Sequence, residues 1–332
     1  MRQQSPSASA RHLDRGRGLA YAAAFLVTVL WSSSFVFIKW GLVDIPPLFF
    51  ATTRYALAFL ILLAVEVGLA SRRETRGHPP RKGQTALLVI AGVSGYTVAQ
   101  GFQFVGLYYL PAVATSFVLN FTPFFALLIG VTTLGEGASL TQIGGLGLSL
   151  VGAYAFFSDR VAWGGQWLGV AVVVASGIGW AIYVVLVRAI QRDGAIDSLR
   201  LTTITMGVGV AGMAVMTAAS GEYAGLTSSG LAIVIWLATA NTAFAFFLWN
   251  WVLRAIPAYE LTMLQDLMLI EIAVFAFLFL GEEITPLMLG GMALVLLGAL
   301  AAQIRGTRVE RAALRRSAEV GRTGAPQTQS QP

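Results

Sequence analysis

Long apolar segments separated by short polar ones run along most of this 332-residue chain. A helix needs about 20 apolar residues to cross the hydrocarbon of a bilayer, and ten segments have roughly that length. Four of them begin at a proline, whose missing N–H is no loss in the first turn of a helix. The pattern predicts an all-α membrane protein with ten transmembrane helices, at residues 19–39, 47–69, 84–108, 111–133, 140–157, 164–188, 199–219, 229–254, 257–280 and 286–304.

Two of the predicted helices begin with residues that can cap the backbone. Ser139 followed by Gln142 is a candidate capping box, in which each side chain accepts a hydrogen bond from the other residue's N–H. Thr285, directly before Pro286, is a candidate N-cap. These residues predict where the fifth and tenth helices start.

The composition supports a membrane protein and excludes several kinds of site. Apolar residues make up 56% of the chain and charged residues 11%, too little charge to coat a soluble globule of this size. There is no cysteine, which excludes disulfides, iron–sulfur clusters and thiolate zinc sites. Both histidines, His12 and His78, lie in polar basic stretches rather than in a predicted helix. We therefore expect no metal site and no cofactor.

The basic residues are sorted to one side of the predicted membrane. With the N-terminus inside, all of the 22 Lys and Arg residues except Lys39, Arg54 and Arg160 lie in inner segments. This asymmetry follows the positive-inside rule and accounts for the high pI without a nucleic-acid partner. It predicts an integral membrane protein with both termini on the inner, cytoplasmic side. Residues 1–18 form a basic segment there, and residues 305–332 form a basic, disordered tail.

The chain repeats its own pattern at an offset of 146 residues. Pro-Ala, Leu-Gly-Glu and Gly-Gly recur without a gap, at 111–112 and 257–258, at 134–136 and 280–282, and at 144–145 and 290–291. Each copy contains five predicted helices, and an odd number inverts the second copy in the membrane. The sequence thus predicts two inverted five-helix repeats, residues 19–157 and 164–304, an arrangement typical of alternating-access transporters.

Three carboxylates occupy the ninth predicted helix, where an ionised side chain near the bilayer centre costs about 2.5 to 3.5 kcal/mol. Glu260 lies one turn after Pro257, near the positive end of the helix, which favours a carboxylate. Asp266 and Glu271 lie near mid-span on different faces. Either they bind substrate or carry a proton, since burial favours their neutral form, or they pair statically with Arg54 or another buried donor.

Other polar and aromatic side chains within the predicted helices are candidates for lining a cavity. Asn120 is the repeat equivalent of Asp266, so this position is polar in both copies. The alternative for each candidate is a hydrogen bond between helices. The candidate substrate-binding residues are Trp31, Ser34, Tyr96, Gln100, Asn120, Trp180, Tyr183, Asn241 and Asp266, and the candidate proton-coupling residues are Asp266 and Glu271.

Four charged residues are candidates for a structural or gating role. Arg54 lies about a third of the way through the second helix, where it could contact an anionic substrate group, pair with an acid, or extend to the outer interface. Lys39 ends the first helix and is expected to extend to the interface as well. Glu136 and Glu282 end equivalent helices in the two copies, which suggests a structural or gating role near the membrane surface.

Several of these motifs together resemble the EamA-type members of the drug/metabolite transporter superfamily. They are Trp31-Ser32-Ser33-Ser34-Phe35 through Lys39, Pro46-Pro47 followed by Arg54, and the twice-used Leu-Gly-Glu. The resemblance covers residues 19–304 and implies ten helices in two inverted repeats around a central cavity, which transport small metabolites, frequently outward. One departure is that Pro123 in the fourth helix is matched by Leu269 in the ninth, so the ninth helix is expected to bend less.

The leading hypothesis is a secondary transporter that exports amino acids, amines or related compounds by alternating access, either by proton antiport or by facilitated exchange. No phosphate loop for ATP and no zinc-protease motif is present in the sequence, so an enzyme is the weaker hypothesis. The alternatives are a membrane enzyme or lipid-handling protein that binds a head group in an acidic cavity, and a non-transporting scaffold. The expected partners are a small-molecule substrate and membrane lipids, and a homodimer is compatible with the sequence.

Overall fold

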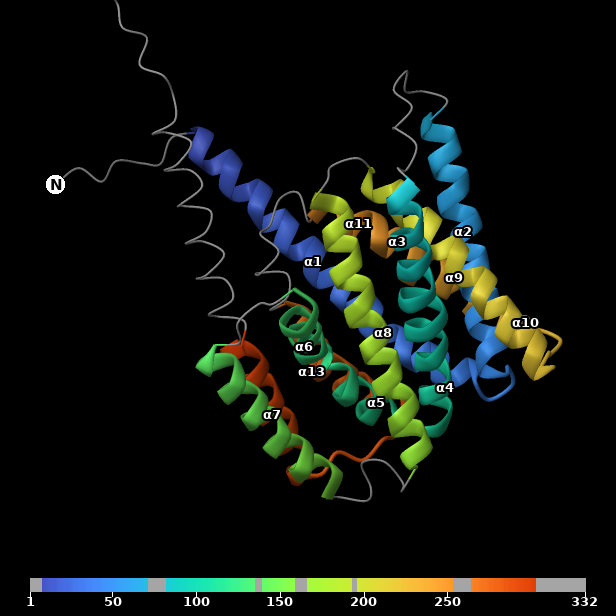
Figure 1. The fold of residues 1–332 in the computed structure, drawn as a ribbon. Coiled ribbons are helices and arrows are strands. Elements are labelled where there is room, and N and C mark those ends of the chain that lie inside the picture. Colours follow the sequence, from blue (N-terminus) through green and yellow to red (C-terminus); the bar gives the residue numbers. More distant parts are fainter. Residues whose placement is uncertain are drawn as a thin grey trace, which may run out of the picture.

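The protein is an all-α membrane protein in which helices are the regular elements of every described segment (Figure 1). The computed structural model describes residues 8–70, 82–134, 139–158, 166–192, 196–252 and 264–302. Within these ranges the helices form ten segments at the predicted places. Seven of them are long and apolar enough to cross a bilayer, and Ser228–Phe244 and Pro286–Ala302 are shorter apolar helices.

Where the helix ends are described, the bounds agree with the predicted ones to within a few residues, except at the N-terminus. The predicted start at 257 and the predicted ends at 254 and 304 lie outside the described residues. The first helix begins at residue 8 instead of 19, so its backbone extends into the basic N-terminal segment. The helices of the first half are α1 (Ala8–Gly41), α2 (Pro47–Ala70), α3 (Lys82–Gly92) continued by η1 (Val93–Gln100) and α4 (Gly101–Tyr109), α5 (Ala112–Leu119), α6 (Thr122–Leu134) and α7 (Leu140–Ser158). Those of the second half are α8 (Trp167–Arg192), α9 (Ser198–Ser220), α10 (Ser228–Ala238) continued by η3 (Thr239–Phe244) and α11 (Ala245–Val252), α13 (Met268–Phe275) continued by η4 (Ala276–Leu280), and the last helix, Pro286–Ala302.

Both predicted caps are present. The Ser139 N–H donates to Gln142 Oε1 (2.9 Å), and the Gln142 N–H donates to Ser139 Oγ (3.3 Å), which is the reciprocal pair of a capping box. Thr285 Oγ1 accepts from the Met288 N–H (3.3 Å). Short-range sequence signals therefore locate these two helix starts correctly.

The ninth helix is interrupted at the position equivalent to the interruption of the fourth, although it has Leu269 where the fourth has Pro123. The first interruption lies at Asn120–Phe121 and the second at Leu267, which is 146 residues after Phe121. At each, an N–H bonds three residues back, from Phe121 to Val118 (3.1 Å) and from Leu267 to Leu264 (3.2 Å). Proline removes a backbone N–H donor, but the second copy forms the same tighter turn at Leu267 without a proline. The interruption therefore does not require a proline at this position.

The fifth and tenth helices pack against each other through a symmetric glycine contact, and Figure 1 shows α7 beside the last helix. A Cβ on Gly145 would lie 2.5 Å from the Gly298 carbonyl oxygen, and one on Gly152 would lie 2.7 Å from that of Gly291. Gly291 and Gly298 are the repeat equivalents of Gly145 and Gly152, so each repeat contributes the same surface, as in a twofold contact. The pairing runs in opposite directions along the two helices, which shows that the repeats are inverted.

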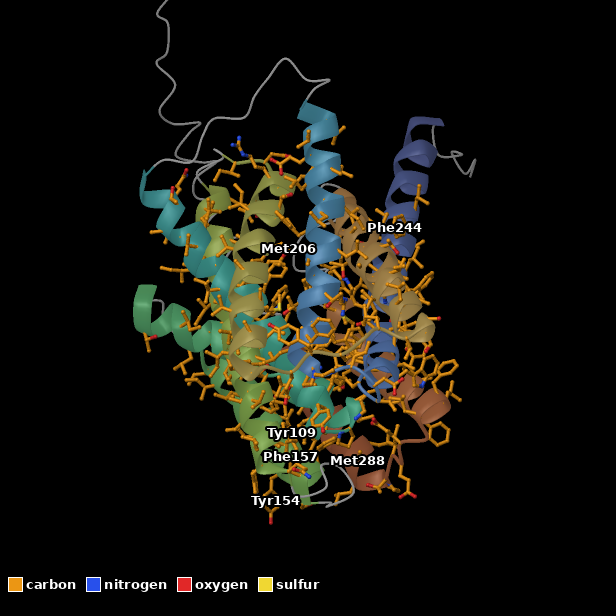
Figure 2. The ribbon with its side chains drawn as sticks, turned by 90° about the vertical axis from the view of Figure 1, so that its right-hand side faces the viewer. Tyr109, Tyr154, Phe157, Met206, Phe244 and Met288 are labelled. Atoms are coloured by element: carbon orange, nitrogen blue, oxygen red, sulfur yellow. The ribbon has the colours of Figure 1, made fainter. Side chains whose placement is uncertain are left out.

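The ends of several helices lie together at one end of the bundle. Figure 2 shows Tyr109, Tyr154, Phe157 and Met288 there, and these residues belong to α4, α7 and the last helix. We call this end the outer end, because the distribution of Lys and Arg predicts that it faces the outer side of the membrane.

Candidate functional site

Glu271 on α13 is bound by two hydroxyl groups of α1. Thr28 Oγ1 donates to Glu271 Oε1 (2.9 Å), and Ser32 Oγ donates to Oε2 (2.7 Å). Both hydroxyl residues are fully buried, and their four-residue spacing places them on one face of the helix. Both carboxylate oxygens act as acceptors, which fits an ionised carboxylate.

Asn241 forms a second polar link to α1. Its Nδ2 donates to the Leu30 carbonyl oxygen and to Ser33 Oγ (3.2 Å). The side chain is 1% exposed, and its Oδ1 has no donor among the described residues. Asn241 lies in the π-helical segment η3, and such segments occur frequently at functional sites.

Arg54 on α2 is buried, with 4% of its surface exposed. Its Nε donates to Thr242 Oγ1 (3.2 Å), and the guanidinium lies 5.1 Å from the ring centre of Tyr55 and 5.7 Å from that of Phe104. No described carboxylate forms an ion pair with it. The structure thus contradicts both the extension of Arg54 to the outer interface and its static pairing with Asp266 or Glu271. The side chain points into the bundle, where it lies against the rings of Tyr55 and Phe104.

Four of the predicted aromatic and amide residues lie in one group with Tyr55, which was not predicted. We call this group the aromatic cluster: Tyr55, Tyr96, Gln100, Trp180 and Tyr183. Tyr55 Oη donates to Gln100 Oε1 (2.6 Å). The Tyr96 ring lies 5.7 Å from the rings of both Tyr55 and Tyr183, and Trp180 stacks on Tyr183 at 4.9 Å. The cluster joins α2 and η1 of the first half to α8 of the second.

The remaining predicted residues do not join these groups. Trp31 packs against the rings of Phe246 and Trp249, at 5.7 and 5.1 Å. Ser34 Oγ donates to the Trp31 carbonyl (2.5 Å) and Asn120 Nδ2 to the Ser116 carbonyl (2.9 Å), both within their own helices. Asp266 is buried, one residue before the interruption of its helix. Glu136 and Glu260 lie outside the described residues.

Four residues that contact the predicted ones were not among the candidates: Thr28, Ser32, Tyr55 and Thr242. Thr28 was missed although it precedes Ser32 by one helical turn in an apolar segment, and that spacing is a usable signal. Tyr55 and Thr242 directly follow predicted residues in the chain. The preceding residues, Arg54 and Asn241, were selected for a charge and for an amide. Tyr55 and Thr242 are important instead through their contacts with Arg54. Among the described residues, no group of three or more His, Asp or Glu side chains could hold a metal ion.

A separate set of contacts closes the outer end. Glu282 Oε1 accepts from the Ala112 N–H (2.6 Å) and Oε2 from the Val113 N–H (3.0 Å), so this carboxylate caps the start of α5, where the helix dipole favours an anion. Lys39 Nζ donates to the carbonyl oxygens of Leu107 (2.9 Å) and Leu110 (3.1 Å). Lys39 therefore binds the end of α4 instead of extending to the interface. We call these contacts of Glu282 and Lys39 the outer clamp.

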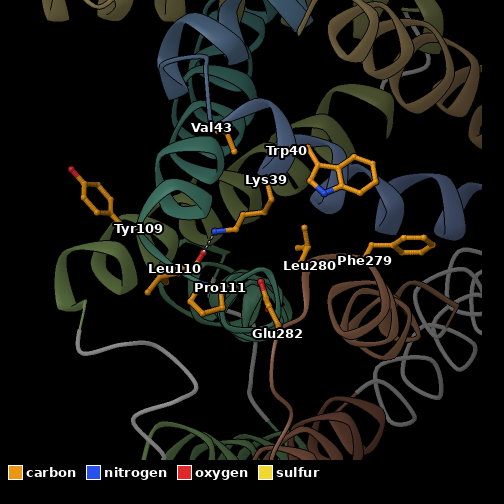
Figure 3. A pocket seen from close by; sticks show the side chains of 9 residues that line it. All are labelled: Lys39, Trp40, Val43, Tyr109, Leu110, Pro111, Phe279, Leu280 and Glu282. Atoms are coloured by element: carbon orange, nitrogen blue, oxygen red, sulfur yellow. Dashed lines mark hydrogen bonds between the residues drawn. The ribbon is translucent and has the colours of Figure 1, made fainter. Parts of the chain in front are cut away.

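The outer clamp lines an open pocket of about 560 Å³, shown in Figure 3. Glu282 and Lys39 lie on its polar side. The other lining residues are Trp40, Val43, Tyr109, Leu110, Pro111, Phe279 and Leu280. Helix ends of both halves thus meet in one pocket at the surface.

Comparison with known proteins places the chain among transporters. The profile of the EamA-like transporter family matches it twice, at residues 18–158 and 167–302. A probable amino-acid metabolite efflux pump of Salmonella typhimurium is 25% identical over 307 residues, which is 87% of this chain and 96% of that protein. An S-adenosylmethionine/S-adenosylhomocysteine transporter of Chlamydia trachomatis is 30% identical over 197 residues, and the match spans 56% of this chain and only 57% of that protein. One solved crystal structure superimposes with a TM-score of 0.58, at 16% identity, over 88% of this chain and 99% of that one, and so shows the same fold.

Proposed function

Because this chain belongs to the EamA-like transporter family, we propose that it is a secondary carrier which exports small metabolites by alternating access. The substrates of this proposal are amino acids, amines or related compounds. The carrier resides in a bacterial-type inner membrane with both termini in the cytoplasm, as the distribution of Lys and Arg indicates. It uses no cofactor.

One observation carries this proposal: the buried polar contacts join one repeat to the other. Glu271 of the second half binds α1 of the first. Asn241 of the second half also binds α1, and Arg54 of the first half binds Thr242 of the second. In inverted-repeat carriers the substrate site lies between the repeats, which move against each other around it. Polar contacts at this boundary are suited to exchange with a substrate.

The names of the relatives support small metabolites as substrates. One is named an amino-acid metabolite efflux pump, which also supports export as the direction. The other is named a transporter of S-adenosylmethionine and S-adenosylhomocysteine. The residues proposed to contact the substrate are Trp31, Tyr96, Gln100, Trp180, Tyr183, Asn241 and Asp266.

Proton coupling is the second part of the proposal, and Asp266 tests it. In proteoliposomes with an imposed pH gradient, we expect Asp266→Asn to lose gradient-driven uptake while keeping exchange of substrate without a gradient. The change introduces the residue that occupies the equivalent position 120, so the fold should tolerate it. Uptake that is insensitive to the gradient in the unmodified protein, and unchanged in the variant, would remove proton coupling from the proposal.

The outer clamp is proposed as the gate of the outer end. Glu282→Ala removes two hydrogen bonds to an anionic acceptor, each contributing about 1.5 to 3 kcal/mol, so we expect the outer end to open more often. Because the chain has no cysteine, a cysteine introduced at Leu110, which lines the pocket and is fully buried, reports this opening by its rate of thiol labelling. We expect labelling to become several times faster in the Glu282→Ala background.

The neighbouring Glu283 provides the control for this experiment, because it is exposed. Glu283→Ala removes the same charge from the same pocket region without removing the cap. Equal labelling rates in the two backgrounds would show that charge alone acts, and the gate would be abandoned.

A further inference from the structure

The third helix of each repeat contains a π-helical segment at the same position. The segment η1 begins 146 residues before η3, which is the offset of the repeat. Each segment closes on a carbonyl five residues back, since the Gly101 N–H donates to Tyr96 and the Ala245 N–H donates to Ala240. Such segments are rare and occur frequently at functional sites. The π form is therefore a feature of both repeats and not an irregularity of one.

The side chain of Thr242 stabilises the π turn of η3. Its hydroxyl donates to the Leu237 carbonyl oxygen, five residues back (2.9 Å). In an α-helix a threonine hydroxyl bonds three or four residues back, as Thr203 does to Leu199 (2.9 Å). The bond of Thr242 thus fits the wider turn of a π-helix and favours it over the α form.

Arg54 on α2 binds this hydroxyl from the other repeat. Its Nε donates to Thr242 Oγ1 (3.2 Å), so the hydroxyl accepts from the guanidinium and donates to the Leu237 carbonyl. Hydrogen bonds in such a chain polarise one another in a low-dielectric interior, and a bond from a charged group is among the stronger ones. Arg54 and Thr242 are 4% and 1% exposed, so water does not compete for the bond.

The next residue of α2, Tyr55, binds the other π segment. Its hydroxyl donates to Oε1 of Gln100, the last residue of η1 (2.6 Å), and its ring packs on that of Tyr96 at 5.7 Å. Consecutive residues of a helix point about 100° apart, which allows one short stretch of α2 to contact both π segments. The Arg54 guanidinium also lies over the Tyr55 ring, so the two sets of contacts are joined.

We propose that Arg54 and Tyr55 are positioning residues, which fasten η3 and η1 to α2 and so set the placement of the polar residues that these segments carry. This inference rests on the proposed carrier function. Asn241 directly precedes Thr242 and binds α1, and Gln100 is bound by Tyr55 itself. Arg54 and Tyr55 act on substrate binding through these side chains, without touching the substrate.

Backbone hydrogen exchange tests the first part of the inference on the full-length purified protein without substrate. Thr242→Val removes both hydrogen bonds of the hydroxyl, so we expect the amides of η3 to exchange about tenfold faster or more. Tyr55→Phe should have the same effect on η1. Thr203→Val is the control, because the Thr203 hydroxyl bonds within its own helix. Exchange at the original rate in both π segments, or equal acceleration of η3 by Thr203→Val, overturns the inference.

Uptake into proteoliposomes tests the second part. Each standard L-amino acid and its decarboxylated amine is offered singly in radiolabelled form, and the compound that the original protein takes up fastest is the probe. We expect Thr242→Val and Arg54→Met to raise the half-saturating concentration of this probe about tenfold. Thr242→Ser keeps the hydroxyl and should restore the original value. A lower maximal rate at an unchanged half-saturating concentration would show a purely structural role and overturn the inference.

A double variant shows whether Arg54 acts through Thr242. If it does, Arg54→Met combined with Thr242→Val is no worse than either change alone, because the second change removes nothing further. A half-saturating concentration that rises by the product of the two single effects overturns the inference. An original protein that takes up none of these compounds would refute the carrier function instead, and hydrogen exchange still decides whether Arg54 and Tyr55 fasten the π segments.

Discussion

Replacing Glu271 with alanine is expected to abolish transport and to lower the thermal stability of the protein in detergent. The change removes the acceptor of two buried hydroxyls on α1, and a hydrogen bond to a charged group contributes about 1.5 to 3 kcal/mol. Thr28 keeps its bond to the Phe25 carbonyl (2.8 Å), so Ser32 bears most of the cost. The two hydrogen bonds between α13 and α1, which lie at the boundary of the two repeats, are lost with the carboxylate.

Glu271→Gln distinguishes a structural role from proton coupling. The amide keeps one acceptor, and its NH₂ can donate to the second hydroxyl, since a hydroxyl both donates and accepts. We expect the melting temperature to stay close to that of the original protein, while uptake no longer responds to a pH gradient. Gradient-driven uptake at the original rate would assign Glu271 to structure alone.

The reverse deletion provides a control for the same contact. Thr28→Val combined with Ser32→Ala leaves the partly buried carboxylate without these two donors, and a charge that loses its partners is more harmful than a missing pair. This double variant should therefore unfold at a lower temperature than Glu271→Gln. If the two unfold alike, the hydroxyls do not stabilise the carboxylate.

Replacing Gly298 with leucine is expected to prevent folding. A Cβ at this position would overlap the Gly145 carbonyl oxygen and Ser149 Oγ. The carbonyl belongs to the backbone of α7 and cannot rotate away, so the two helices must separate. Gly298→Ala should already destabilise the protein by about 1 to 3 kcal/mol, which is typical of overpacking. Yield of monodisperse protein and the melting temperature measure both effects.

Gly290 is the matched control, because it lies in the same helix and a Cβ there meets nothing within 4 Å. Gly290→Ala should stabilise the helix by about 0.5 to 1 kcal/mol through reduced backbone entropy in the unfolded chain. The two substitutions are chemically identical and have opposite expected signs. Equal effects would contradict the glycine contact between α7 and the last helix.

A rescue experiment tests the source of the clash. Adding Ser149→Gly to Gly298→Ala removes the side-chain part of the overlap and leaves the part with the Gly145 carbonyl. We expect little recovery of stability. Full recovery would show that the serine side chain, and not the approach of the two backbones, demands glycine at this position.

The candidate site was predictable as a set of residues but not as a set of pairs. Tyr96, Gln100, Trp180 and Tyr183 were selected because polar or aromatic groups in apolar helices are unusual, and the structure brings them together. Asn120 and Ser34 were selected by the same criterion, yet each is bonded within its own helix. Composition cannot distinguish these cases, since the difference lies in the rotation of each helix about its axis.

The charged residues show the same division. Sequence position suggested that Lys39 and Arg54 extend to the interface, because long basic side chains near helix ends often do. In the structure Lys39 binds two carbonyl groups at the end of α4, and Arg54 lies buried against two rings. The carbonyl groups that bind Lys39 lie 68 and 71 residues away in the chain. Of the residues that contact Arg54, Tyr55 is its neighbour in the chain, but Thr242 lies 188 residues away, and no local pattern contains it.

Local patterns were sufficient for the ten helices, their caps, the inverted repeat and the identity of the polar residues within the membrane. These properties follow from the order of residues alone: from the length of the apolar segments, the capping side chains, the distribution of positive charge and the repeat at an offset of 146 residues. The folded chain was needed to show that Glu271 binds α1, that Arg54 lacks an acidic partner among the described residues, and that Leu267 interrupts its helix without a proline. Each of these depends on how distant helices are placed against one another, and packing free energy, which is summed over the whole bundle, determines that placement.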